Sequence, residues 1–250
     1  LPDHGRWVLD VAFSPKGDLL ATASADGTVR LWKTSGWQLH ALLEHPDAVN
    51  CLAFSGDGTR LLSGCADSKI RSWNIRSKQV ERTLEGHTNE VTCLAFSPTG
   101  SQLASGSKDH SIRTWDWKQG VCLWTRAPHK GAITDVVYSR DGSIVYSASE
   151  STTVWAMKAD SGNPFQSFRS HTSEVTSLAI LDEGRRLITG SADRTIKVWD
   201  TRTATELLSL NGHEGVITDL AYCPKEKRII SGSSNGTLRF WDGLSRRGMK

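Results

Sequence analysis

The chain has 250 residues, and its 30 lysines and arginines against 27 aspartates and glutamates give a formal charge of +3. Hydrophobic residues make up 38% and charged residues 23%, which is ordinary for a globular protein. The charge is not the clustered basic charge of a nucleic-acid-binding domain, and no segment approaches the ~18 consecutive apolar residues of a membrane span. We therefore expect neither direct contact with nucleic acid nor insertion in a membrane.

The 5 cysteines are odd in number, form no Cys-x-x-Cys pair and lie mostly in apolar segments. This pattern predicts reduced thiols rather than a disulfide framework or a zinc site. It favours an intracellular protein, cytoplasmic or nuclear. No signal peptide is visible, but the chain starts at Leu1 rather than Met, so an upstream segment is not excluded.

Histidines recur at a fixed interval of 42 residues. His4 precedes the first of these by 41 residues, and the five that keep the interval are His45, His87, His129, His171 and His213. Six of the 10 tryptophans follow these histidines by 28 residues, except that Trp155 follows His129 by 26. A period of about 40–45 residues indicates a repeat architecture.

Each repeat contains four short segments with the composition of β-strands. In the third repeat these are 91–97, 102–107, 111–115 and a fourth near 121–126. Glycine- and proline-containing turns follow the first strand, at 14–17, 55–58, 97–100, 139–142 and 181–184, with a degraded turn at 223–226. No segment has the length and periodicity of a helix, so we predict antiparallel sheets that stack on one another.

The units LEGHTNEVTCLAFSPTGSQLASGSKDHSIRTWD (84–116) and NGHEGVITDLAYCPKEKRIISGSSNGTLRFWD (211–242) resemble repeats of the WD40 β-propeller family. The resemblance covers residues 4–242. It implies an all-β fold of four-stranded antiparallel blades. We assign residues 1–250 to one propeller domain, with approximate repeats 4–44, 45–86, 87–128, 129–170, 171–212 and 213–250.

A histidine, a serine or threonine, an aspartate and a tryptophan recur in the repeats. Hydrolases use the first three residue types, but an active site is normally built once, whereas this set recurs and threonine serves as well as serine. We predict a hydrogen-bond chain in which aspartate accepts from histidine, histidine reaches the hydroxyl, and the hydroxyl accepts from the tryptophan N–H. The resemblance implies the same structural tetrad. Its expected members are His4, Thr22, Asp26, Trp32; His45, Ser63, Asp67, Trp73; His87, Ser105, Asp109, Trp115; His129, Ser147, Trp155; His171, Thr189, Asp193, Trp199; His213, Ser231, Asn235 and Trp241.

The fourth repeat departs from this pattern between residues 147 and 158. We interpret the segment as two residues shorter before Trp155, with a compensating longer turn around 159–164. The aspartate is then lost, and Glu150 is the candidate replacement. His129 is expected to lack its usual acceptor. In the sixth repeat, Asn235 replaces the aspartate and keeps an acceptor.

The resemblance implies that partner contacts concentrate on the face carrying the loops between blades and the loops between the second and third strands. Three positions per repeat point there: three and five residues after the histidine, and the residue before the aspartate. Trp7 is either an exposed anchor for a partner or a cap on an incomplete first blade. Glu90 and Glu174 are the two acidic residues at these positions and would favour a basic peptide segment. The candidates are Trp7, Leu9, Asn50, Glu90, Thr92, Lys108, Glu174 and Val216. Trp37, Trp117 and Trp124 lie in or near outer strands, where they either pack or form a second partner surface.

Six sets of inner strands are expected but only five outer strands, around 37–43, 78–84, 119–125, 164–169 and 205–210. We therefore predict a domain incomplete at one or both ends, part of a longer protein with a seven-bladed ring. The alternative is a six-bladed ring with a defective last blade. The basic segment 245–250 is expected to be a frayed tail.

The leading hypothesis for function is a non-catalytic scaffold or adaptor that binds segments of other proteins within a multiprotein complex. The alternative is a sensor or regulatory array of a larger protein with a separate catalytic or nucleotide-binding domain. A propeller enzyme would need one unique polar cluster, and the sequence offers none. No metal or cofactor is expected, because no His-x-x-x-His, paired carboxylate or phosphate-binding loop occurs.

Overall fold

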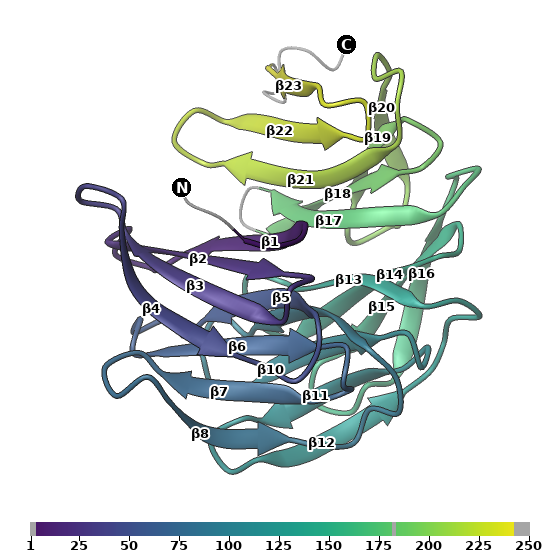
Figure 1. Ribbon diagram of the computed structural model, residues 1–250. Helices are drawn as coiled ribbons and strands as arrows, with labels where there is room; N and C mark the ends of the chain where they lie inside the picture. The colour runs from purple at the N-terminus through teal and green to yellow at the C-terminus, as the bar shows by residue number, and fades with distance from the viewer. Residues whose placement is uncertain (1–3, 182–183, 243–250) are drawn as a thin grey trace. The chain divides into compact units, whose positions relative to one another are not determined.

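The computed structural model describes residues 4–181 and 184–242, and within them every element of regular structure longer than a turn is a β-strand (Figure 1). The predicted all-β fold is therefore confirmed. Part of the predicted turn at 181–184 and the predicted frayed tail at 245–250 lie outside the described residues.

The first compact unit is Leu1–Ala127, and it holds three four-stranded antiparallel sheets, here blades one to three. Successive strands lie side by side in chain order in each blade. Blade one is β1 (Val8–Phe13), β2 (Leu19–Ser24), β3 (Thr28–Lys33) and β4 (Gln38–Glu44). Blade two is β5 (Val49–Phe54), β6 (Arg60–Cys65), β7 (Ile70–Asn74) and β8 (Gln79–Leu84). Blade three is β9 (Val91–Phe96), β10 (Leu103–Ser107), β11 (Ile112–Asp116) and β12 (Val121–Arg126).

The second unit is Pro128–Lys250 and holds blades four to six. Blades four and five have four strands, and blade six has three among the described residues. Blade four is β13 (Ile133–Tyr138), β14 (Ile144–Ser149), β15 (Thr153–Lys158) and β16 (Pro164–Arg169). Blade five is β17 (Val175–Leu181), β18 (Arg186–Ser191), β19 (Ile196–Asp200) and β20 (Glu206–Leu210). Blade six is β21 (Ile217–Cys223), β22 (Arg228–Ser233) and β23 (Leu238–Trp241).

Neighbouring blades within a unit share hydrophobic cores. Blade one contributes Val29 and Leu31 to a cluster that includes Val49 and Leu52 of blade two, all less than 7% exposed. The same arrangement joins blades two and three, blades four and five, and blades five and six. Within each unit, the first strand of blades two, three, five and six therefore packs on the blade before it, which explains why the second strands are buried on both faces.

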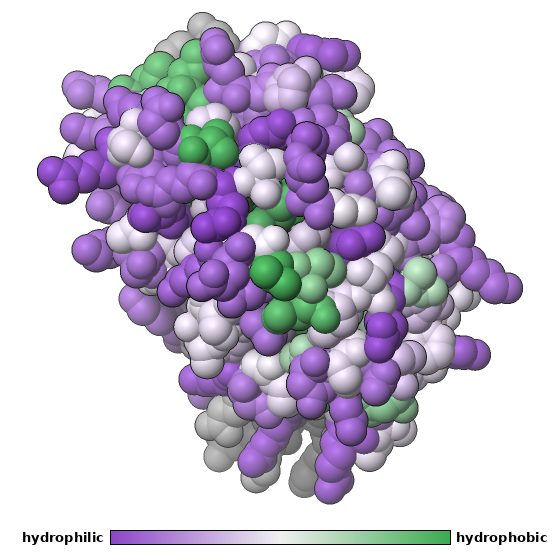
Figure 2. Space-filling model, turned by 90° about the horizontal axis from the view of Figure 1, so that it is seen from below, coloured by the Kyte–Doolittle hydropathy of each residue, from purple (hydrophilic) through white to green (hydrophobic). Residues whose placement is uncertain are grey.

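The first strand of blade one has no such cover from the described residues. Val8 is 49% exposed, whereas the corresponding Val49 is fully buried. Val11 and Phe13 are also exposed on β1, as are Leu238 and Phe240 on β23. On the face of the molecule seen in Figure 2, hydrophilic residues predominate and hydrophobic side chains form a few small groups. Strands β1 and β23 therefore expose apolar side chains at positions that are less exposed in the other blades.

Candidate functional site

The histidine network of blade three joins four side chains that the sequence pairs by spacing. His87 Nδ1 lies 2.9 Å from Asp109 Oδ2, and its Nε2 lies 2.7 Å from Ser105 Oγ. The Trp115 indole donates to the same serine oxygen over 2.9 Å. The network links the loop that precedes the blade to its second and third strands. Corresponding contacts join His4, Thr22, Asp26 and Trp32, and His171, Thr189, Asp193 and Trp199.

A fifth member, which we did not anticipate, is a hydroxyl two residues after the aspartate. Ser111 Oγ donates to Asp109 over 2.6 Å and lies 3.2 Å from His87 Nδ1. Thr28 and Thr195 do the same in blades one and five. A serine or threonine stands 24 residues after the histidine in five of the six repeats, and this periodicity could have identified the position.

Blade two departs from the predicted tetrad. Asp67 is paired with Arg71, whose two terminal nitrogens lie 3.1 and 2.5 Å from the carboxylate oxygens. His45 Nδ1 instead lies 3.3 Å from the carbonyl oxygen of Leu43. Two substitutions explain this: Pro46 has no backbone N–H where Thr88 donates to Asp109, and Lys69 stands where other blades have the hydroxyl. The predicted contact between His45 and Asp67 is therefore wrong, while Ser63 still joins His45 and Trp73.

In blade four, the predicted two-residue shortening is wrong. Met157 pairs with Val145 in the strand register, just as Trp115 pairs with Leu103, so Met157 and not Trp155 occupies the tryptophan position. Met157 is fully buried. Trp155 lies half-buried opposite Ser147, with the Arg169 guanidinium 5.8 Å from its ring centre. The sequence offered two candidates for one position, and the spacing of 28 residues would have selected the methionine.

The acceptor predicted to be missing in blade four is replaced by serines. His129 Nδ1 lies 2.8 Å from Ser149 Oγ, which lies 2.7 Å from Ser151 Oγ at the aspartate position. Glu150 is not the replacement, because its backbone N–H donates to Ala132 as the residue before the aspartate does in other blades. His129 Nε2 retains its contact with Ser147 at 2.8 Å.

Blade six keeps the hydroxyl but not the direct acidic contact. Thr237 Oγ1 donates to Asn235 over 2.7 Å and lies 3.3 Å from His213 Nδ1, so the amide reaches the histidine through the threonine. Ser231 joins His213 and the Trp241 indole at 2.7 and 2.8 Å. Asn235 therefore keeps an acceptor, as expected, but this acceptor serves Thr237, which in turn contacts His213.

The electrostatics of these networks are those of buried structural groups. Burial alone would raise the pKa of Asp193, but hydrogen bonds from Thr195, His171 and the backbone lower it to about 2. Burial lowers the pKa of His129 to about 4, so this imidazole is neutral at pH 7. In the blades other than blade four, the serine or threonine hydroxyl is held between the histidine and the indole N–H. The arrangement stabilises the blade and leaves the hydroxyl surrounded by its partners.

The loop ends of the blades bring two of the three predicted partner positions together. In every blade the backbone N–H of the residue before the aspartate position donates to the carbonyl of the residue three after the histidine, over 2.8–2.9 Å. Trp7 is bonded in this way to Ala25, and Glu90 to Lys108. These positions therefore form adjacent pairs at the loop end of each sheet.

The candidate partner residues differ in availability. Trp7 is 83% exposed, and Leu9 and Glu174 are also exposed. Glu90 is engaged by Lys108, whose ammonium lies 3.0 Å from its carboxylate. Asn50, Thr92 and Val216 are partly buried, and Asn50 donates to the Val91 carbonyl over 3.0 Å, which ties blade two to blade three.

Positions five residues after the histidine serve the contact between blades elsewhere too. Thr134 and Thr176 each donate to the first residue of the next blade over 2.6 Å. Six residues after the histidine, Asp10 and Asp135 accept the backbone N–H of Leu52 and Leu178 over 2.7 Å. These polar side chains fix one blade to the next. Of the candidates three or five residues after the histidine, those that stay exposed are Trp7 and Glu174, at the first of these positions, and Leu9, at the second.

Six repeated antiparallel sheets, each with a histidine–hydroxyl contact that an indole N–H completes in all but blade four, define the β-propeller class. Six segments match the WD domain, G-beta repeat: residues 1–33, 36–74, 78–116, 120–155, 162–200 and 204–242. The chain therefore belongs to the WD40 family, whose propellers bind other proteins and are generally non-catalytic interaction modules.

Individual relatives match over one repeat. A stretch of 36 residues, 14% of this chain, is 61% identical to "U4/U6 small nuclear ribonucleoprotein PRP4-like protein" of Arabidopsis thaliana and covers 6% of that protein. A stretch of 39 residues, 16% of this chain, is 49% identical to "Target of rapamycin complex subunit LST8" of Bos taurus and covers 12% of it. The mouse protein of the same name matches equally.

Two further properties of the described residues bear on the type of site. Among residues 4–181 and 184–242, no histidine, cysteine, aspartate or glutamate cluster of three or more could hold a metal ion. In the same residues, no helix has the length and apolar character needed to cross a membrane.

Proposed function

We propose that this chain is a non-catalytic scaffold that holds segments of partner proteins at the loop ends of its blades, within a larger complex. The observation that carries the proposal is the exposure of Trp7, at 83%, beside Leu9 at the loop end of blade one. Large aromatic side chains supply much of the binding energy of protein interfaces. Two relatives that match over one repeat bear names of assemblies, a ribonucleoprotein and a complex subunit, which agrees with this role.

Each unit has a proposed partner contact of its own, which is apolar at blade one and acidic at blade five. Glu174 is exposed and has no ion pair with a described residue, whereas Glu90 is already paired with Lys108. We therefore propose Trp7, Leu9 and Glu174 as the principal contacts, with Lys108 and Val216 at the margins. The five free cysteines agree with a reducing, intracellular compartment.

The test is a comparison of proteins captured from native lysate by the parent chain and by Trp7→Ala. We expect the variant to lose partners that the parent retains, because truncation of a central aromatic contact typically weakens binding by about 2 kcal/mol or more. Quantitative mass spectrometry of the captured proteins measures the loss, and thermal melting verifies that the variant is folded.

Trp37→Ala is the matched control. Trp37 is also an exposed tryptophan of blade one, at 50%, but it precedes β4 at the opposite end of the strands. The control should capture the same partners as the parent. If Trp7→Ala captures the full set while Trp37→Ala loses it, the loop end is not the binding surface.

A further inference from the structure

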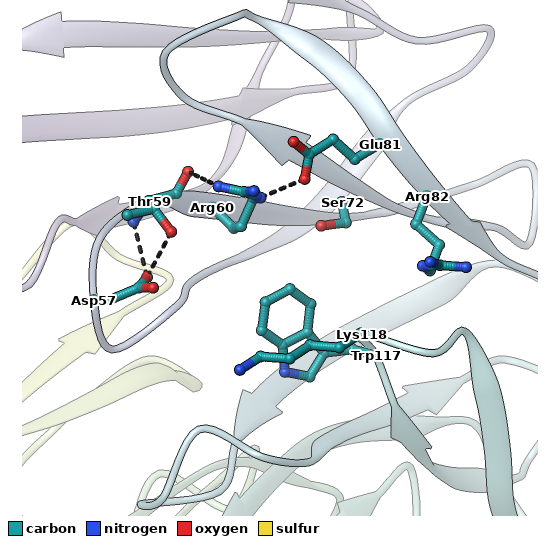
Figure 3. Close-up of a pocket in the computed structure, with 8 residues that line it drawn as sticks. All are labelled: Asp57, Thr59, Arg60, Ser72, Glu81, Arg82, Trp117 and Lys118. Atoms are coloured by element: carbon teal, nitrogen blue, oxygen red, sulfur yellow. Dashed lines mark hydrogen bonds and ion pairs between the residues drawn. The ribbon is translucent and has the colours of Figure 1, made fainter.

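A polar hollow between blades two and three lies at the opposite end of the strands from the loop end. Its volume is about 370 Å³, within the roughly 300–1,000 Å³ of typical ligand sites. The turn between β5 and β6, together with strands β6, β7 and β8 of blade two, forms one wall. The turn after β11 in blade three forms the other (Figure 3). The lining residues are Asp57, Thr59, Arg60, Ser72, Glu81, Arg82, Trp117 and Lys118.

A small residue, Ser72, lies at this hollow, at a position held by larger residues in blades one and five and by Thr114 and Ala156 in blades three and four. Ser72 on β7 pairs with Leu62, as Leu31 pairs with Ala21 in blade one and Val198 pairs with Ile188 in blade five. Leu31 and Val198 are fully buried and fill this space in their blades. Serine leaves it open to the polar residues around it.

Ser72 is a buried residue whose hydroxyl opens onto the hollow and forms no hydrogen bond with a described residue. The side chain is 2% exposed and lines the hollow, where Figure 3 shows it facing the Trp117 ring. Its hydroxyl is therefore available to donate a hydrogen bond to a polar group that enters the hollow.

Trp117 forms a fixed wall of the hollow. Its indole N–H donates to the Gly100 carbonyl over 3.0 Å, and its ring meets the edge of Phe96 at 5.5 Å. The residue is 7% exposed and belongs to the core shared by blades two and three. The wall is therefore rigid before any ligand binds, which limits the entropy lost on binding.

Two cations at this hollow have no carboxylate partner among the described residues. Lys118 Nζ lies 5.5 Å from the centre of the Trp117 ring, and Arg82 donates only to the Gln119 carbonyl, over 3.2 Å. Arg60, in contrast, is paired with Glu81 at 2.5 Å. Hydrogen bonds from Ser55 and Thr59 lower the pKa of Asp57 to about 2, so this carboxylate remains charged.

We propose that this hollow binds the carboxylate side chain of an acidic peptide segment from a partner protein, at a second site distinct from the loop end. Arg82, Lys118 and the Ser72 hydroxyl supply the donors, and Trp117 supplies the wall. Three cations against two carboxylates leave one net positive charge in the lining, which matches a single carboxylate. A dianionic phosphate would exceed it.

The test uses a fluorescein-labelled peptide, acetyl-Gly-Glu-Gly-Glu-Gly-amide, and the same peptide with glutamine, bound to the full-length protein. We expect the glutamate peptide to bind at least tenfold more tightly. Arg82→Gln with Lys118→Gln should weaken its binding tenfold or more, and Ser72→Leu should do the same by filling the hollow. Fluorescence anisotropy measures the dissociation constants.

Arg76→Gln with Arg202→Gln removes the same charge from exposed turns outside the hollow and should change binding less than threefold. Trp7→Ala should bind the peptide as the parent does, so failure here is independent of the loop-end proposal. Equal losses in the Arg82/Lys118 and Arg76/Arg202 variants would show non-selective charge attraction and overturn the site. A phosphoserine peptide that binds tenfold more tightly than the glutamate peptide would overturn the assignment to a carboxylate. If the parent binds neither peptide, both the site and its assignment to a carboxylate are overturned.

Discussion

At the scale of single residues, small substitutions decide how each buried histidine is satisfied. His87 has Asp109 and Ser111 as partners, His129 has Ser149, and His45 turns to a backbone carbonyl because Asp67 is engaged by Arg71. Burial lowers the pKa of both His45 and His129 to about 4, and neither histidine has a carboxylate contact that would favour the charged form. Protonation of these two residues is therefore coupled to unfolding.

The first prediction concerns pH. The unfolded histidines take up protons as the pH falls through about 6.5, whereas the folded ones remain neutral until about pH 4. Because the unfolded chain binds more protons in this window, stability falls as the pH falls from 6.5 to 4. We expect the free energy of unfolding to drop by roughly 3 kcal/mol per histidine, because the folded and unfolded pKa values differ by about 2.5.

Urea denaturation at intervals between pH 7 and pH 4 measures this dependence. His45→Gln removes one of the histidines whose pKa burial lowers and should flatten the curve in the same window, even if the variant is less stable throughout. A free energy of unfolding that is constant between pH 6.5 and 4.5 would show that the two histidines are not kept neutral by burial.

At the scale of the strand, the spacing within a repeat determines which residue is buried. The strands and the six repeats could be predicted from the sequence, since the 42-residue period coincides with short segments of strand-like composition, separated by turns, in each repeat. The register of β15 could not be predicted from residue type, because Trp155 resembles the expected tryptophan while Met157 fills its place. Methionine is flexible enough to occupy a site shaped for a larger ring.

The hydrogen-bond partner of each network histidine could not be predicted from the motif either. The aspartate position suggested the histidine contact in blade two, but the missing N–H of Pro46 and the lysine at position 69 act against it. Such effects depend on the neighbours of a residue in space, and a motif of four residues does not include them. Likewise, the hollow combines Ser72 of blade two with Trp117 of blade three, which are close in space but distant in sequence.

The strand register predicts unequal costs for two tryptophan truncations. Trp115 is 1% exposed and hydrogen-bonded within its network, so Trp115→Ala should reduce the free energy of unfolding by about 3–5 kcal/mol. Trp155 is half-buried beneath Arg169, so Trp155→Ala should cost about 1 kcal/mol. Denaturation of the two variants under identical conditions gives the comparison. An equally large loss of unfolding free energy in both would show that Trp155, and not Met157, occupies the buried position.

At the scale of the whole molecule, the two ends of the strands have different characters. The loop end carries Trp7 and Glu174, together with backbone bonds that recur in all six blades. The other end carries the tight turns between first and second strands and, in blades two and three, the polar hollow. We propose that the loop end holds the main partner and that the hollow contributes a second, acidic contact. Whether the ring has seven blades stays a prediction.

The most direct test of the loop-end assignment is hydrogen exchange of the chain, alone and bound to a partner captured as described above. Our account predicts slower exchange on binding in segments 5–9 and 172–176, because partner contact shields the backbone at the loop ends of blades one and five. The turn at 34–37 in blade one should exchange at the same rate in both states. Protection confined to that turn, with none at 5–9 or 172–176, would contradict the assignment of partner binding to the loop end.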